Sequence, residues 1–91
     1  MDKMGITYSL ETCAQLAAAQ KQFRRAAVLW GSAEQLRYTL KQLPDPLREK
    51  LDTSLIPATR AQLGEETFAE AWAEGRKLKM QEAIEYALTV V

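Results

Sequence analysis

Apolar residues recur every three or four positions along nearly the whole chain, a spacing that is typical of amphipathic helices. No stretch alternates apolar and polar residues over several positions, and valine and isoleucine are scarce, so strands are not expected. The spacing predicts five helices, which cover about residues 8–20, 23–42, 46–63, 65–77 and 80–90. We therefore expect an all-α fold.

The first two predicted helices should form a hairpin. Their link, Gln20–Gln22, is so short that they should pack antiparallel. Gly31 lies inside the second helix, where glycine costs up to about 1 kcal/mol relative to alanine, so another helix should cross closely there. We expect one helical domain over residues 1–91, with a repeat-like hairpin at 7–42 packed on C-terminal helices at 46–91.

Prolines and glycines mark the predicted ends of the later helices. Pro46 suits the first residue of the third helix, with Asp45 as its N-cap. Pro57 lacks a backbone donor and clashes with the preceding turn, so we expect a kink or a break just before it. Gly64 and Gly75 are interpreted as residues that mark helix ends.

The predicted core is small because much of the apolar share of 47% is alanine, which favours closely packed helices over a bulky core. The larger apolar side chains of the helical stripes should anchor it. These are Phe23, Trp30, Leu36, Phe68, Trp72, Ile84 and Leu88.

Composition argues against several classes of function. The 12 acidic and 12 basic residues balance, and neither half of the chain is strongly polarised, so no direct contact with nucleic acid is expected. The single cysteine, Cys13, cannot form an internal disulfide, which favours a reducing, cytoplasmic setting. No apolar run approaches the roughly 20 residues that a bilayer requires, and the first residues lack the apolar core of a signal peptide, so no membrane contact is expected.

No residue pattern predicts catalysis, a cofactor or a metal. The chain has no histidine to activate Cys13, which is interpreted as a small buried hydrophobe. The glycines are scattered and form no phosphate loop. Four acids of one predicted helix could share a hard cation, but a solvated face is favoured because calcium and magnesium sites usually draw on loops. They are Glu65, Glu66, Glu70 and Glu74.

Lys21, Arg24 and Arg25 form the densest basic cluster. We interpret it as a solvated turn, since phosphate binding is weak without a basic excess. A helix-turn-helix DNA reader is conceivable at this length. It is disfavoured because the second predicted helix buries an aromatic stripe and its exposed side mixes charges.

The first two predicted helices resemble one tetratricopeptide repeat, a helix hairpin of about 34 residues. The matching small and aromatic positions are Ala14, Ala26, Trp30 and Ala33. Lys21 stands where that repeat has its turn glycine, which makes the hairpin a degenerate or terminal repeat.

Three longer segments, 26–34, 63–76 and 83–88, resemble the C-terminal part of large bacterial regulators. Those are LuxR-type or cyclase-linked proteins with an ATPase core and a long helical-repeat tail. The resemblance implies a protein-interaction or scaffold module, docked on neighbouring repeats or on a second copy as a homodimer.

In such repeats the first helix lines the partner-facing side. That implies an interaction surface of Tyr8, Glu11, Thr12 and Gln15. The alternative is a small-molecule sensor with an apolar pocket between Trp30, Phe68 and Trp72.

Overall fold

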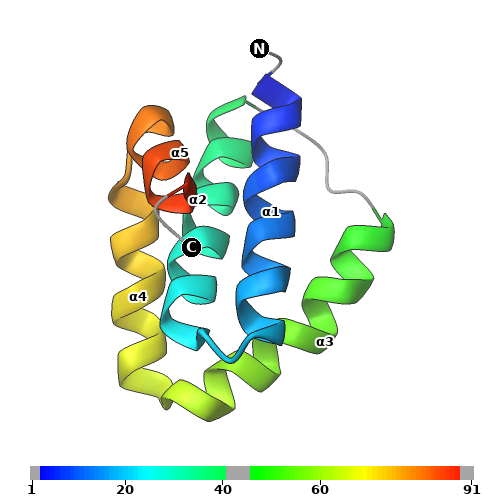
Figure 1. Cartoon of the computed structure of the whole chain (residues 1–91), viewed down its shortest axis with the longest axis vertical. Helices are drawn as coiled ribbons and strands as arrows, with labels where there is room; N and C mark the ends of the chain where they lie inside the picture. Colours follow the sequence, from blue (N-terminus) through cyan, green and yellow to red (C-terminus); the bar gives the residue numbers. More distant parts are fainter. Residues whose placement is uncertain (1–2, 41–45, 89–91) are drawn as a thin grey trace.

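A computed structural model of the chain describes the backbone of residues 3–40 and 46–88 and, apart from 3–6, 8, 40, 46–54 and 80, their side chains. These residues form five helices and no strand, which confirms the predicted all-α fold (Figure 1). The helices are α1 (Lys3–Ala19), α2 (Phe23–Leu40), α3 (Pro46–Leu63), α4 (Glu65–Lys77) and α5 (Met80–Leu88).

The turn between α1 and α2 is a Schellman motif. Lys21 has a φ of 63°, in the left-handed region. Its amide donates to the Ala18 carbonyl at 3.0 Å, and the Gln22 amide donates to the Ala17 carbonyl at 2.8 Å. These two bonds satisfy carbonyls that would otherwise be left unpaired at the end of α1, and they turn the chain antiparallel into α2.

Helix α1 begins at Lys3, which corrects the predicted start near Tyr8. The apolar stripe of Leu10, Ala14 and Ala17 continues one turn earlier through Thr7, which is buried. Because Thr7 is polar, the sequence pattern hides this additional turn.

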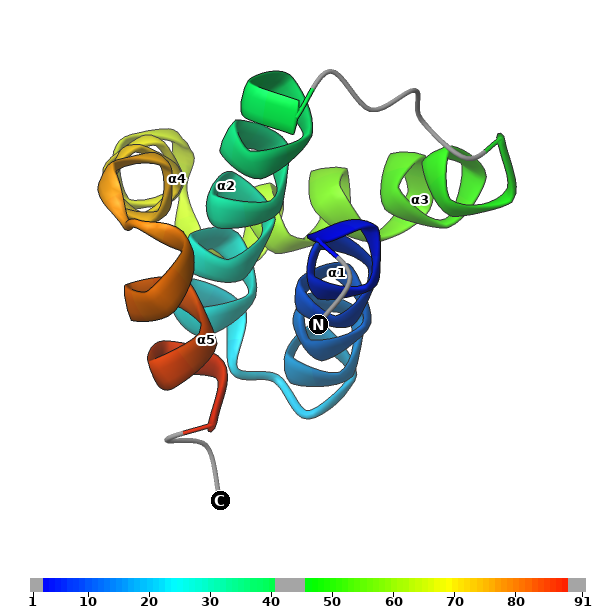
Figure 2. The same ribbon diagram turned by 90° about the horizontal axis from the view of Figure 1, so that it is seen from above.

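Helix α2 lies between α1 and α4, as both views show (Figures 1 and 2). Every residue from Ala26 to Ala33 is buried. One side of α2 packs with α1 through Leu29 and Trp30, and the other packs with α4 through Ala27 and Val28. A helix that is apolar on two opposite sides is expected to be enclosed in this way. Helices α3 and α5 lie on opposite sides of the α1, α2 and α4 layer (Figure 2).

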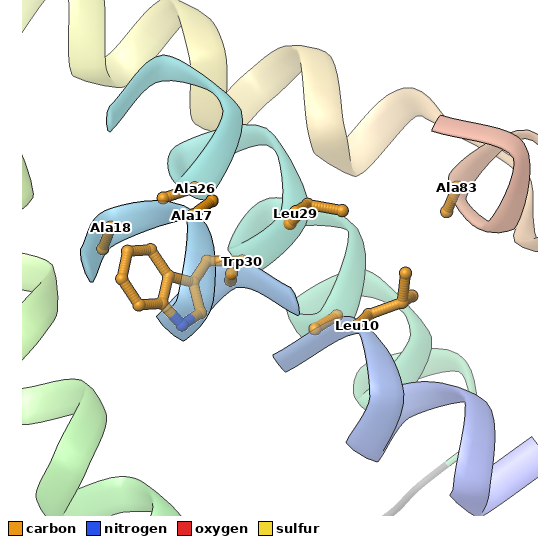
Figure 3. Packing of buried hydrophobic residues seen from close by; sticks show 9 residues of the cluster. Leu10, Ala17, Ala18, Ala26, Leu29, Trp30 and Ala83 are labelled. Atoms are coloured by element: carbon orange, nitrogen blue, oxygen red, sulfur yellow. The ribbon is translucent and has the colours of Figure 1, made fainter. Parts of the chain in front are cut away.

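The α1–α2 contact is rich in alanine (Figure 3). Ala14, Ala26 and Ala33 are fully buried, and the Trp30 ring lies beside Ala17 and Ala18. Small side chains let the two backbones approach, so one indole can fill the remaining space.

The α2–α4 contact depends on two glycines that face opposite backbones. A Cβ on Gly31 would overlap the carbonyl oxygen of Trp72, and a Cβ on Gly75 would overlap that of Val28. The Ser32 hydroxyl lies 3.0 Å from both the Val28 and the Gly75 carbonyl oxygens, so it links the two helices. The close crossing predicted at Gly31 is confirmed. The interpretation of Gly75 as a helix end is wrong, because Gly75 lies inside α4 and contacts the backbone of α2.

Helix α3 is continuous from Pro46 to Leu63, so Pro57 does not break it. Of the predicted kink or break, the break is therefore wrong, and the kink stays a prediction. Pro57 is exposed, which leaves room for its ring on the outer side of the helix. The buried Thr59 hydroxyl donates to the Leu55 carbonyl at 2.9 Å. Pro46 is the first residue of α3, as predicted, whereas its predicted cap, Asp45, lies outside the described residues.

Gly64 separates α3 from α4 with a φ of 85°, which confirms its predicted position at a helix end. The following helix has Glu65 and Glu66 in its first turn and Arg76 and Lys77 in its last. This order favours α4 because acids stabilise the positive N-terminal end of the helix dipole and bases the negative C-terminal end.

The predicted core anchors are partly confirmed. Trp30 and Phe68 are buried. The others, Phe23, Leu36, Trp72 and Ile84, are half-buried. Leu88 is 76% exposed, so its prediction as an anchor is wrong. It lies at the edge of the α5 stripe, whose buried centre is Ala83.

Candidate interaction surface

The predicted interaction surface on α1 is only partly on the outside of the molecule. Thr12 is exposed and Gln15 is half-buried, while the side chain of Tyr8 lies outside the described part of the chain. Glu11 is buried, and its carboxylate lies 3.2 Å from the guanidinium of Arg37 on α2. Glu11 therefore joins the two helices, and its carboxylate is not available at the surface.

Sequence reasoning missed Leu16, which is 58% exposed on the same outer side of α1 as Thr12. A groove of about 250 Å³ runs beside it between α1 and α5. Its lining includes Cys13, Leu16 and Ala17 from α1 and Ala87 from α5. Leu16 could have been found as the one leucine of the first predicted helix that lies off the stripe through Leu10.

Cys13 is half-buried in this groove, not enclosed as predicted. Its neighbours in the lining supply no histidine or carboxylate. The groove therefore offers mainly apolar contact from Cys13, Leu16, Ala17 and Ala87.

The basic cluster is divided among three different environments. Lys21 occupies the turn and is exposed. Arg24 forms an exposed ion pair with Glu74 of α4, at 2.6 Å. Arg25 reaches α5, where it donates to the carbonyl oxygen of Tyr86 at 2.6 Å and stacks over the Tyr86 ring at 4.8 Å. Arg25 therefore fixes the C-terminal end of α5, where a cation is favourable.

The predicted aromatic pocket does not form as expected. Trp30 is 1% exposed and packs toward α1, whereas Phe68 packs with Ala27 and Val28 on the other side of α2. Trp72 contacts both clusters. Phe68 and Trp72 instead line an open groove of about 460 Å³ between α2, α3 and α4. The periodicity placed all three rings on buried helix faces. It could not show that α2 has two buried faces, one toward α1 and one toward α4.

The acidic residues of α4 are exposed, as predicted, at Glu65, Glu66, Glu70 and Glu74. Among the side chains that the structure describes, no three from His, Cys, Asp and Glu converge as a metal site would require. Over the same part of the chain, no helix combines the length and apolar character needed to cross a bilayer.

No known family model matches the chain, and no solved structure matches it. The chain is 32% identical over 83 residues to a candidate HTH-type transcriptional regulator of Mycobacterium bovis. It has the same identity to counterparts from two strains of Mycobacterium tuberculosis. The aligned part is 91% of this chain but only 9% of each relative. These matches support a transcriptional-regulator setting, and the tetratricopeptide-like and homodimer assignments stay predictions.

The prediction of no direct nucleic-acid contact is contradicted by these relatives, because HTH-type regulators are a class that binds DNA. The prediction rested on the balanced charge of 91 residues. Since the chain corresponds to 9% of each relative, its net charge does not describe the charge of a whole regulator.

Proposed function

We propose that this chain is a protein-interaction module of a bacterial transcriptional regulator, of the helical-repeat kind that its sequence resembles at the C-terminal end of such proteins. The module docks on another helical segment through the outer face of α1. One observation carries the proposal: Leu16 is exposed beside an apolar groove, on a hairpin whose inner face is fully packed.

The contact is proposed to centre on Leu16, with Thr12 one turn before it and Gln15 adjacent. A large apolar side chain at a surface groove is the kind of anchor that fills a matching pocket, while polar neighbours form the rim. We propose that the module acts without catalysis, in the cytoplasm. DNA contact by the same protein, as the class of its relatives implies, is compatible with this role.

Site-specific photo-crosslinking in bacterial cells tests the proposal. The photoreactive amino acid p-benzoylphenylalanine replaces Thr12 or Leu16, and Glu70 on α4 serves as the matched exposed control. We expect the same discrete cross-linked protein band from both α1 positions and none from Glu70. An equal band at all three positions, or no discrete band at either α1 position, would contradict the proposal.

A further inference from the structure

The groove between α2, α3 and α4 has the size of a small-molecule site. Its volume of about 460 Å³ falls within the roughly 300–1,000 Å³ that such sites occupy. Phe68 is buried, and the half-buried Trp72 lies beside it with a ring-to-ring distance of 5.3 Å. Because Ala69 and Ala73 line the groove with only methyl groups, the Trp72 side of this aromatic floor stays open to a flat apolar group.

A guanidinium stands at one end of this floor. Arg60, the last basic residue of α3, lies 4.9 Å above the Phe68 ring centroid. Stacking fixes the guanidinium plane while leaving its N–H edges directed outward. Its side chain is 51% exposed, and among the described residues it donates no hydrogen bond. Its Nε forms a long ion pair with the carboxylate of the exposed Glu65, at 3.9 Å, which is beyond hydrogen-bond distance.

At the other end of the groove, the guanidinium of Arg76 already has partners. Arg76 lies 3.4 Å from the Glu34 carboxylate and donates to the Gln35 side-chain oxygen at 3.3 Å. An incoming anion would therefore compete with two close partners at Arg76, whereas at Arg60 it would compete with the longer ion pair to Glu65. The groove thus has an apolar floor and one available cationic end.

We propose that this groove binds a small organic carboxylate with an aromatic or other flat apolar body. The body lies on Trp72, next to the Phe68 ring that Arg60 covers, and the carboxylate accepts two parallel hydrogen bonds from Arg60, the geometry that guanidinium and carboxylate favour. This groove lies on the α3 side of the α1, α2 and α4 layer, whereas the proposed docking face borders the α1–α5 groove on its other side, so the site does not depend on the proposed function (Figure 2).

The test is a titration of the ¹⁵N-labelled chain with 1-naphthoate, followed by NMR. The chain has two tryptophans, so the indole N–H signals of Trp72 in the groove and Trp30 in the core serve as probe and internal reference. We expect a saturable shift of the Trp72 signal with a dissociation constant on the order of 1 mM or tighter, and little change at Trp30. The neutral 1-naphthamide should bind at least about fivefold more weakly, because it cannot form the charged pair.

Variants separate the Arg60 contact from general charge effects. Arg60→Gln should weaken naphthoate binding about tenfold, whereas Arg24→Gln, which removes the same charge from an exposed residue outside the groove, should leave it unchanged. Glu65→Gln removes the competing carboxylate and should tighten binding by about two- to fivefold. Ala73→Leu should block the floor, while Glu70→Leu, outside the groove, should not.

Three results would overturn the proposal. They are an unshifted Trp72 signal at 20-fold the expected ~1 mM constant, equal binding of naphthoate and naphthamide, or equal losses in Arg60→Gln and Arg24→Gln. Circular dichroism of each variant establishes that the chain is folded before its binding is compared.

Discussion

At the scale of single residues, two glycines set how closely α4 approaches α2. Gly31 and Gly75 each meet a carbonyl oxygen of the other helix at a distance that leaves no space for a Cβ. The same region buries Ser32, whose hydroxyl is satisfied only by carbonyls of these two helices. Separation of the helices would therefore lose packing and also leave a buried hydroxyl without its interhelical acceptor.

Gly75→Ala should lower the free energy of unfolding by about 2 kcal/mol or more, because the added methyl group must push α4 away from Val28. Urea denaturation followed by circular dichroism measures the change. Glu70→Ala, on the exposed side of the same helix, is the control and should change stability by no more than about 0.5 kcal/mol. Equal effects of the two substitutions would refute the close α2–α4 contact.

Lys21→Gly should raise the free energy of unfolding by about 0.5–1 kcal/mol. Lys21 has a φ of 63°, a conformation that costs an L-residue about 1 kcal/mol and glycine nothing. Gln20→Gly, one residue earlier and outside the left-handed region, should instead destabilise the chain. The same urea measurement distinguishes them, and a loss of stability in Lys21→Gly would show that the turn is not left-handed.

These residues show what the sequence could and could not predict. Gly31 was predictable because a glycine in mid-helix needs a reason, and close packing is the usual one. Gly75 near the end of α4 has the same role, but a glycine there equally suits a helix end. Only the position of α2 distinguishes the two interpretations. Likewise, Arg60 and Phe68 meet across the Gly64 turn, and no sequence spacing predicts that contact.

At the scale of helices, α5 packs on the core through Ala83 and is also held by one polar side chain of α2, Arg25. Among its described contacts, Arg25 of α2 donates to the carbonyls of Tyr86 and Ala87 and stacks on the Tyr86 ring. At the other end of α5, the Glu82 carboxylate accepts from the Lys79 amide at 2.9 Å. This bond is one half of a capping box, so α5 needs no serine or threonine at its start.

Arg25→Met should loosen α5 selectively. Methionine keeps most of the apolar stem but removes the charged hydrogen bonds, which are worth about 1.5–3 kcal/mol each. Among the described residues, the buried Nε of Arg25 has no acceptor, so the net loss should fall toward the lower value. Native-state hydrogen exchange should therefore be at least about tenfold faster for α5 amides and nearly unchanged for α4 amides.

Arg24→Met provides the matched control for this exchange experiment, because its ion pair with Glu74 is exposed. It should leave α5 exchange unchanged. If Arg25→Met instead accelerated exchange in α4 and α5 equally, Arg25 would stabilise the whole fold and not the attachment of α5.

The sequence predicted helix boundaries correctly where a proline or a glycine determines them. Pro46 and Gly64 mark the start and end of α3, and the acids of α4 follow directly. The early start of α1 could not be predicted, since a buried threonine replaces an apolar residue there. In the candidate site, the resemblance to repeat hairpins implied an outward position for both Thr12 and Glu11, and only Thr12 is exposed. The burial of Glu11 depends on Arg37 of the neighbouring helix.

At the scale of the whole molecule, α2 is enclosed between α1 and α4, and the outer face of α1 presents Leu16 beside a groove. The chain aligns over 91% of its length with a segment that makes up 9% of each mycobacterial relative. Together these observations support an interaction module whose inner contacts hold the fold and whose outer α1 face meets a partner.

The most direct test is a chimera. The 83-residue segment of the Mycobacterium tuberculosis relative that aligns with this chain is replaced by the chain, and the transcript profile is compared with those of the unmodified and segment-deleted strains. We predict that the chimera restores the unmodified profile. With Leu16→Glu it should resemble the deletion, whereas Gln62→Glu, an equal charge change at an exposed position of α3, should not. A chimera indistinguishable from the deletion, or one unaffected by Leu16→Glu, would contradict the proposed docking role.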